Sequence, residues 1–300
     1  MLKSFRICEP GSVEEACEFL AQHGLAAAVY AGGTELLLAM KEDLLAPEYL
    51  VDVKHLGLGG ISFSSSGREV RIGATTTHRE LEAWSASRSQ WEALAEMEHG
   101  VANVRVRNQG TIGGNLCFGE PHADPGTLLS AWDASVEITD PHGRRQLPIG
   151  GFLLDEFATA LAEGDVMTAV VIPPAPARSG TAYLRFGFLE RPTIGVATQV
   201  ALDPDGETVS QTRIAVGAVG PRPERIEPAE SELVGVHSGT GEWPMAVARA
   251  ASRAAETCTV AADAHGSEDY KRHLVEVFVW RALEVARARA HADAARNAGQ

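Results

Sequence analysis

Two segments with paired glycines constrain this chain more than any other feature of its sequence. The first, Ala31-Gly-Gly-Thr-Glu35, follows a short apolar run over residues 26–31 and precedes helical spacing over residues 35–41. Paired glycines let backbone N–H groups approach an anion without an intervening Cβ, and a following helix directs its free N–H groups to the same place. The motif alone predicts a pyrophosphate cradle and a ligand-free tight turn equally well.

The second segment, residues 109–116, reads Gln-Gly-Thr-Ile-Gly-Gly-Asn-Leu. Gly113 and Gly114 again reduce a predicted loop to backbone, and Thr111 and Asn115 add side chains that can form hydrogen bonds. Asp124 follows, either to accept hydrogen bonds from cofactor hydroxyls or to cap the next helix. Neither segment matches the Rossmann or Walker pattern, but two of them in one α+β unit suit a long dinucleotide better than a single phosphate.

A proline-rich break, Pro173-Pro-Ala-Pro176, predicts the main domain boundary because neither a helix nor a central strand accommodates it. Before the break, strands and helices mix. After it, two strands flank the turn at residues 203–206, and alanine-rich helices follow over 242–257 and 268–288. We therefore expect an α+β protein with domains at 1–174 and 180–288 and a frayed tail at 289–300.

Local patterns predict the remaining elements. Capping-box spacing at Ser12–Glu15 and Thr77–Glu80 predicts two helix starts, and Gly24 predicts the end of the first helix. A further helix is expected over residues 90–98 and another through Leu128 and Trp132. Apolar or alternating runs predict strands at residues 50–53, 70–74, 135–139, 166–172, 195–202 and 212–219.

Charge and hydropathy exclude several classes of protein. The chain has 40 acidic and 26 basic residues, for a net charge of −14, and its basic residues are scattered, so a nucleic-acid surface is not expected. The first residues lack the apolar core of a signal peptide, and no run reaches the ~18 apolar residues of a membrane helix. We expect a cytoplasmic protein without a membrane span.

The sequence offers no metal site and no set of catalytic residues. Four cysteines without C-x-x-C spacing predict free thiols and exclude an iron–sulfur cluster in this chain. Ten histidines include no H-x-H or H-E-x-x-H pattern. His122 and Asp124 could form an acid–base pair, but a solvated loop histidine is the favoured interpretation. Three tryptophans at helical spacing, expected in the core rather than against a flavin, are Trp84, Trp91 and Trp132.

Taken together, the motifs resemble the FAD-binding medium subunits of the molybdenum hydroxylases, which include the carbon monoxide dehydrogenase medium subunit and the flavin region of xanthine dehydrogenase. The resemblance covers nearly the whole chain. Besides the two glycine segments, it rests on stretches that look like family signatures at Ile72–His78, Gly217–Arg225 and Tyr270–Leu274.

The resemblance implies an FAD-binding domain of the vanillyl-alcohol-oxidase (PCMH) type in two parts. It also implies a C-terminal domain with a three-stranded antiparallel sheet and a helical bundle. It places Asp124 on cofactor hydroxyls, and Arg185 and Arg191 near the flavin rim; Thr75 is expected to face the cofactor, and Thr77 to cap a helix. Glu35 departs from the family's usual Asp, Ser or Gln. The residues implied for the pyrophosphate, phosphate and ribityl parts of FAD are Ala31, Gly32, Gly33, Thr34, Glu35, Thr111, Ile112, Gly113, Gly114 and Asn115.

The implied function is electron transfer. A large molybdopterin subunit would oxidise the substrate, a small iron–sulfur subunit would pass electrons on, and FAD in this chain would reduce a terminal acceptor within a heterotrimeric oxidoreductase. Two alternatives stay open: a self-contained FAD-dependent oxidase or reductase on the same fold, and a flavin-free scaffold subunit.

Overall fold

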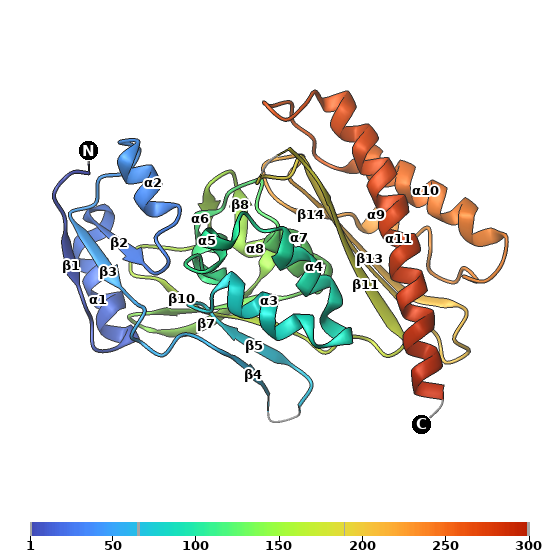
Figure 1. The fold of residues 1–300 in the computed structure, drawn as a ribbon, viewed down its shortest axis with the longest axis horizontal. Coiled ribbons are helices and arrows are strands. Elements are labelled where there is room, and N and C mark those ends of the chain that lie inside the picture. The colour runs from blue at the N-terminus through green and yellow to red at the C-terminus, as the bar shows by residue number, and fades with distance from the viewer. Residues whose placement is uncertain (1, 65–66, 189, 299–300) are drawn as a thin grey trace. The chain divides into compact units, whose positions relative to one another are not determined.

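The computed structural model describes residues 2–64, 67–188 and 190–298, drawn as a ribbon in Figure 1. The chain forms two compact units, and each unit is assembled from three separate stretches of sequence. The first unit comprises residues up to 81, 102–120 and 134–173. The second unit comprises residues 82–101, 121–133 and 174 onward.

The first unit begins with a parallel three-stranded sheet in the order β1-β3-β2. Its strands are β1 (Arg6–Cys8), β2 (Ala27–Tyr30) and β3 (Tyr49–Asp52). Helix α1 (Val13–His23) buries Ala16, Cys17 and Leu20 in the same apolar cluster as Val51. The predicted helix start is confirmed, because the Ser12 hydroxyl accepts a hydrogen bond from the Glu15 N–H at 3.1 Å, and Gly24 ends the helix. The Glu15 carboxylate accepts from the Gly11 N–H rather than from the Ser12 N–H of a full capping box.

A second, antiparallel sheet of the first unit has the order β4-β5-β10-β6-β7. Its strands are β4 (Ile61–Phe63), β5 (Val70–Gly73), β6 (Ser135–Asp140), β7 (Gly143–Pro148) and β10 (Val166–Ile172). Strand β10 is buried at every position, as expected for the central strand of a covered sheet. Strand β7 was not predicted because its sequence is polar, which suits an edge position.

The second unit is built on an antiparallel sheet in the order β11-β12-β13-β14. Its strands are β11 (Ser179–Phe186), β12 (Ile194–Leu202), β13 (Val209–Gly217) and β14 (Glu224–Arg225). The predicted three-stranded sheet is therefore confirmed, with the two-residue β14 added at one edge. Every residue of β12 is buried, because helices contact this sheet on both faces.

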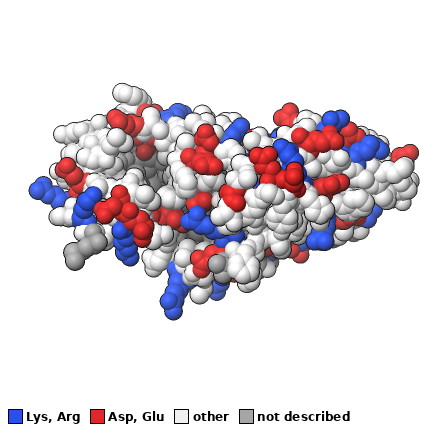
Figure 2. Space-filling view, turned by 90° about the horizontal axis from the view of Figure 1, so that it is seen from above, with Lys and Arg blue, Asp and Glu red and all other residues white. Residues whose placement is uncertain are grey.

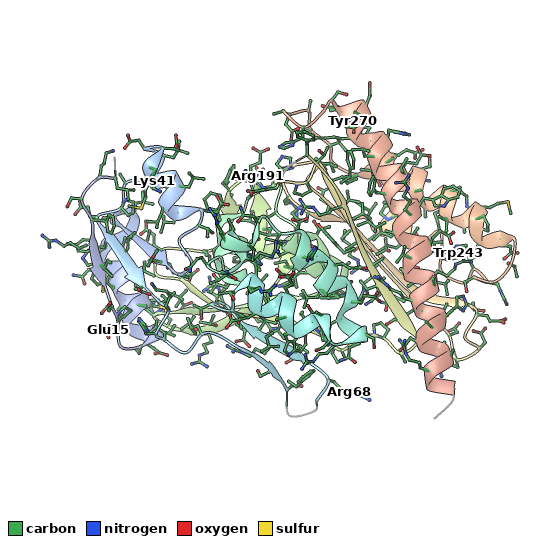
Figure 3. All side chains as sticks on the ribbon, in the orientation of Figure 1. Glu15, Lys41, Arg68, Arg191, Trp243 and Tyr270 are labelled. Carbon is green, nitrogen blue, oxygen red and sulfur yellow. The ribbon has the colours of Figure 1, made fainter. Side chains whose placement is uncertain are left out.

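Helices α10 (Glu242–Thr257) and α11 (Glu268–Ala298) share an apolar cluster with one face of this sheet (Figure 1). Trp243, labelled in Figure 3, is fully buried in that cluster and donates its indole N–H to Glu284 at 2.8 Å. The sequence predicts that α11 ends at Ala288, but the helix continues to Ala298; residues 299–300 of the predicted frayed tail lie outside the described residues.

The other face of the sheet contacts α4 (Glu92–Gly100) and α7 (Pro125–Ala131). The three tryptophans lie together there, with ring centroids 5.2 Å apart for Trp84 and Trp91 and 5.5 Å apart for Trp91 and Trp132. Trp132 is buried, as predicted, whereas Trp84 and Trp91 are only half-buried. Strand β11 was not predicted, since it starts within the expected linker. At its start, Gly180 lies directly against the backbone of α11.

The remaining elements are short. They are α2 (Leu36–Lys41), α3 (His78–Ala86), α5 (Val104–Arg107), α6 (Ile112–Phe118), α8 (Ile149–Phe152), β8 (Leu153–Asp155), β9 (Ala158–Thr159), α9 (Glu227–Glu230), and 3-10 turns at Gly24–Ala26 and Ser89–Trp91. In the described part of the chain, no helix has both the length and the apolar content to span a bilayer.

Candidate functional site

The first glycine segment lies between β2 and α2 in the first unit, as the sequence predicts. Gly33 adopts a left-handed backbone with φ of 69°, and its carbonyl accepts a hydrogen bond from the Leu37 N–H at 3.1 Å. Glu35 occupies the N-cap position of α2. Within the described residues, the N–H groups of Gly32, Gly33 and Thr34 make no hydrogen bond to protein, so they are available to a ligand.

The second glycine segment is helical rather than a loop, which corrects the prediction for Thr111–Asn115. Helix α6 begins at Ile112, and the Thr111 hydroxyl caps it by accepting a hydrogen bond from the Gly114 N–H at 3.0 Å. The N–H groups of Ile112 and Gly113 donate to the carbonyls of residues 76 and 74. Because these donors are already satisfied, the α6 N-terminus does not present them to an anion.

The two glycine segments lie against each other within the first unit. A Cβ on Gly32 would be 2.8 Å from the carbonyl carbon of Gln109 and 2.9 Å from the Cα of Gly110. A Cβ on Gly110 would in turn be 3.4 Å from the Thr34 hydroxyl. Gly32 is therefore required by the close approach of two backbone segments, in addition to any ligand. Gly113 is required in the same way, since its Cβ would lie 2.7 Å from the Cβ of Ala74.

Thr75 belongs to the same group of residues. It lies between the two residues whose carbonyls accept the first α6 N–H groups, and its own N–H donates to Leu58 at 2.9 Å. Thr77 is a helix cap, as predicted, because its hydroxyl accepts from the Glu80 N–H at 3.2 Å and contacts the Glu80 carboxylate at 2.8 Å. The first unit thus brings the two glycine segments and Thr75 together.

One side of α6 has the properties of a ligand-facing surface. Gly114 is exposed, and a Cβ there would meet only the Thr111 hydroxyl, at 3.0 Å. The Asn115 side-chain oxygen is buried without a hydrogen-bond partner among the described residues. Buried polar atoms are nearly always paired, so an unpaired one beside an open glycine fits the binding of a polar ligand.

The predicted residues of the second unit form a separate hydrogen-bonded group. Asp124 is 4% exposed; its carboxylate accepts from the Tyr183 hydroxyl at 2.6 Å and lies 3.4 Å from the Arg185 side chain. Burial, followed by the charge of Asp124, raises the pKa of Tyr183 well above its usual value, so this hydroxyl stays a donor. Asp124 makes no side-chain bond to the first turn of α7, which excludes the helix-cap role for its side chain.

Tyr183 was not predicted as a site residue. Its position two residues before Arg185 on an alternating strand places both side chains on one face of β11, and this periodicity is the signal that could have identified it. Arg185 also contacts the Gly100 carbonyl and donates to the Glu190 carbonyl at 3.0 Å. Arg191, labelled in Figure 3, is exposed in the connection between β11 and β12.

His122 does not match its prediction as a solvated loop histidine. Its side chain is 13% exposed, and its two ring nitrogens contact the Pro192 carbonyl at 2.8 Å and the Asp263 carboxylate at 3.0 Å. The sequence could not indicate this arrangement, because Asp263 is distant along the chain.

Metal ligands, cysteines and surface charges are the other features that bear on function. No group of three or more His, Cys, Asp or Glu side chains in the described ranges is arranged to hold a metal ion. All four cysteines are free thiols, as predicted. Acidic and basic side chains intermingle over the face seen in Figure 2, without a continuous basic field that would attract nucleic acid.

Comparisons with known proteins agree with this arrangement. The family described as "FAD binding domain in molybdopterin dehydrogenase" matches residues 3–175, and the family described as "CO dehydrogenase flavoprotein C-terminal domain" matches residues 190–286. The carbon monoxide dehydrogenase medium chain of Hydrogenophaga pseudoflava is 37% identical over 95% of this chain and 98% of its own length. The carbon monoxide dehydrogenase medium chain of Afipia carboxidovorans is 32% identical over 96% of this chain and 98% of its own length.

Solved structures show the same fold. A chain of the Hydrogenophaga pseudoflava carbon monoxide dehydrogenase that lacks the Mo-pyranopterin moiety of the molybdenum cofactor superposes with a TM-score of 0.89 at 36% identity, over 96% of this chain and 99% of that one.

Proposed function

The chain belongs to the FAD-binding subunits of the molybdopterin dehydrogenase family, and from this membership we propose how its residues hold FAD. The protein is an oxidoreductase subunit that acts within a multi-subunit enzyme. FAD, when bound, takes up electrons singly and releases them as a pair. The residues of this chain bind and orient the cofactor.

We propose that the segment Ala31–Glu35 holds the FAD pyrophosphate. The observation that carries this assignment is the set of three adjacent N–H groups, Gly32 to Thr34, that donate to no protein atom in the described structure. They lie in a segment with little side chain, where an anion would replace water as their acceptor. The Thr34 hydroxyl, beside Gly110, adds a fourth donor.

The segment Thr111–Asn115 and Thr75 are proposed to contact the phosphate and ribityl parts of FAD. Since the first α6 N–H groups are already bonded, the contact is made through side chains and through the open side of Gly114. The unpaired Asn115 oxygen accepts a hydrogen bond from a ribityl hydroxyl, which supplies the partner that the protein lacks. Ile112, buried between these residues, anchors the helix.

Asp124, Arg185 and Arg191 are also proposed to act on FAD. The Asp124 carboxylate accepts hydrogen bonds from cofactor hydroxyls, held in orientation by the Tyr183 hydroxyl and by Arg185. Arg185 and Arg191 place positive charge near the flavin rim. This charge stabilises electron density gained by the flavin. We also propose family domains at residues 1–174 and 180–288, although residues 82–101 and 121–133 of the first belong to the second compact unit.

The partners follow from the family. We propose a large molybdopterin subunit that oxidises the substrate and a small iron–sulfur subunit that transfers electrons to FAD in this chain, within a cytoplasmic heterotrimer.

Purification of the complex from its native host tests the proposal. A flavin spectrum, molybdenum, iron and two further co-purifying chains are expected. Turnover of a small organic substrate by this chain alone would instead establish a self-contained oxidase or reductase. A chain without flavin that takes up none when FAD is added would establish a scaffold.

A further inference from the structure

The His122 ring lies between two hydrogen-bond acceptors. Its Nδ1 is 2.8 Å from the Pro192 carbonyl oxygen, and its Nε2 is 3.0 Å from the Asp263 carboxylate. A neutral imidazole carries one donor and one acceptor nitrogen, whereas the imidazolium carries two donors. Only the doubly protonated ring satisfies both contacts, because neither a carbonyl nor an ionised carboxylate can donate.

The Asp263 carboxylate is held in its ionised form. Burial alone would raise the pKa of Asp263, but hydrogen bonds from the Lys271 ammonium at 2.6 Å and from the His265 N–H at 2.8 Å outweigh it and lower that pKa. The Lys271 side chain is 1% exposed, so its ammonium group has little water to replace Asp263 as its partner. Asp263 therefore accepts from Lys271 and His122 together.

The other titratable groups near His122 are a second histidine and two basic side chains. The His265 ring centroid lies 4.4 Å from that of His122. Burial, and then the positive charge of His122, lowers the pKa of His265, so His265 is the neutral member of the pair. The positive charge of Arg191 also lowers the pKa of His265. The charged and titratable groups near the His122 and His265 pair include Asp263, Lys271 and Arg191.

We propose that His122, in its doubly protonated form, is a positioning residue for FAD binding. It ties together three segments of the second unit: the residues that lead to Asp124, the β11–β12 connection that carries Arg191, and the turn at Asp263. The inference rests on the proposed roles of Asp124 and Arg191 in holding FAD.

The proposed tie depends on pH. When the ring loses a proton, one nitrogen lone pair faces an oxygen lone pair of Pro192 or Asp263, and an attractive contact becomes repulsive. The connection that carries Arg191 is then released from the segment that carries Asp124. FAD is therefore held more weakly when the ring carries a single proton.

The test measures FAD affinity of the full chain, by flavin fluorescence, at pH 6 and pH 8.5. We expect the dissociation constant of the wild-type chain to rise about tenfold between these pH values, as for one charge-assisted hydrogen bond. His122→Gln can donate only one of the two bonds and carries no charge, so it should bind weakly and without this pH dependence. The matched control is His237→Gln, which removes a histidine 2.6 Å from Glu207 elsewhere in the second unit and should keep the wild-type profile.

The protonation state of His122 can also be measured directly. Nitrogen NMR of the wild-type chain, labelled at histidine, should show both His122 ring nitrogens protonated at pH 6, and one proton lost in parallel with FAD release. This measurement also decides the matter if His122→Gln fails to fold. A singly protonated His122 at pH 6, or a pH profile shared by wild type and a folded His122→Gln, overturns the inference. A wild-type chain that binds no FAD at either pH overturns the proposed function instead.

Discussion

Alanine substitutions at Gly32 and Gly114 should separate a glycine needed for folding from one needed for the ligand. At Gly32 the new Cβ would lie 2.8 Å from the Gln109 carbonyl carbon. Two carbon atoms pack best at about 3.5–4.0 Å, so the segments must separate by roughly 0.7 Å or more. Overpacking of this kind typically costs about 1–3 kcal/mol. Gly32→Ala should therefore destabilise the chain even without FAD.

Gly114→Ala should behave in the opposite way. The new methyl group would lie 3.0 Å from the Thr111 hydroxyl, which must shift by a few tenths of an ångström. Alanine in place of glycine within a helix contributes up to about 1 kcal/mol of stability, which offsets this shift. The free energy of unfolding of the FAD-free chain should be unchanged or slightly raised. FAD affinity should fall about tenfold, equivalent to about 1.4 kcal/mol, because the methyl group occupies the open side of α6.

Urea unfolding of the FAD-free chain and titration with FAD give the two quantities for each variant. The reasoning is refuted if Gly32→Ala unfolds like wild type while losing FAD, because backbone contact would then not explain that glycine. It is equally refuted if Gly114→Ala destabilises the FAD-free chain and binds FAD normally.

Three further predictions follow from single contacts. Tyr183→Phe should lower the free energy of unfolding by about 1–3 kcal/mol in urea titrations, because it removes the buried donor to Asp124; an unchanged value would show that the bond adds nothing. Hydrogen bonds from the Thr208 hydroxyl and nearby backbone N–H groups lower the pKa of Asp205 to about 2, so its contribution is present above about pH 4 and lost as pH falls towards 2. Melting curves of Asp205→Asn should therefore show a smaller loss of stability than wild type between pH 5 and pH 2.5, and an equal loss would contradict this. Iodoacetamide at pH 8 should leave the thiols with strongly raised pKa values unmodified until denaturant is added, and mass spectrometry would reveal any early labelling. Burial raises these pKa values to about 11 for Cys17, about 12 for Cys117 and about 12 for Cys258.

Sequence reasoning succeeded where the determining interaction is local. The N-caps at Ser12 and Thr77 each involve a residue three positions on, and both helices start there as predicted. Strand β10 is a continuous apolar run, so its existence as a strand could be predicted. The order of the two glycine segments and the C-terminal signatures were sufficient to identify the family and its fold.

The failures have a common cause, since each depends on residues distant in sequence. Helix α6 begins within a glycine-rich stretch because carbonyls at residues 74 and 76 satisfy its first N–H groups. His122 is buried because Asp263 and Pro192 reach it from other parts of the chain. Gly32 and Gly113 suggested a ligand site, yet each glycine is already required because a Cβ there would clash with neighbouring protein atoms. The assignment of individual residues to parts of FAD stays a prediction.

The second unit is assembled from three separate stretches of sequence, so its parts are synthesised at different times. Helices α4 and α7 leave the ribosome well before β12, β13 and α11, the elements that they or their sheet must contact. During that interval their apolar faces have no native cover and are open to chaperones or to wrong partners. A fragment stopped at residue 174 would carry these faces permanently. The proline-rich break marks a change of texture in the sequence, but it is not a place where the protein can be divided into self-sufficient halves.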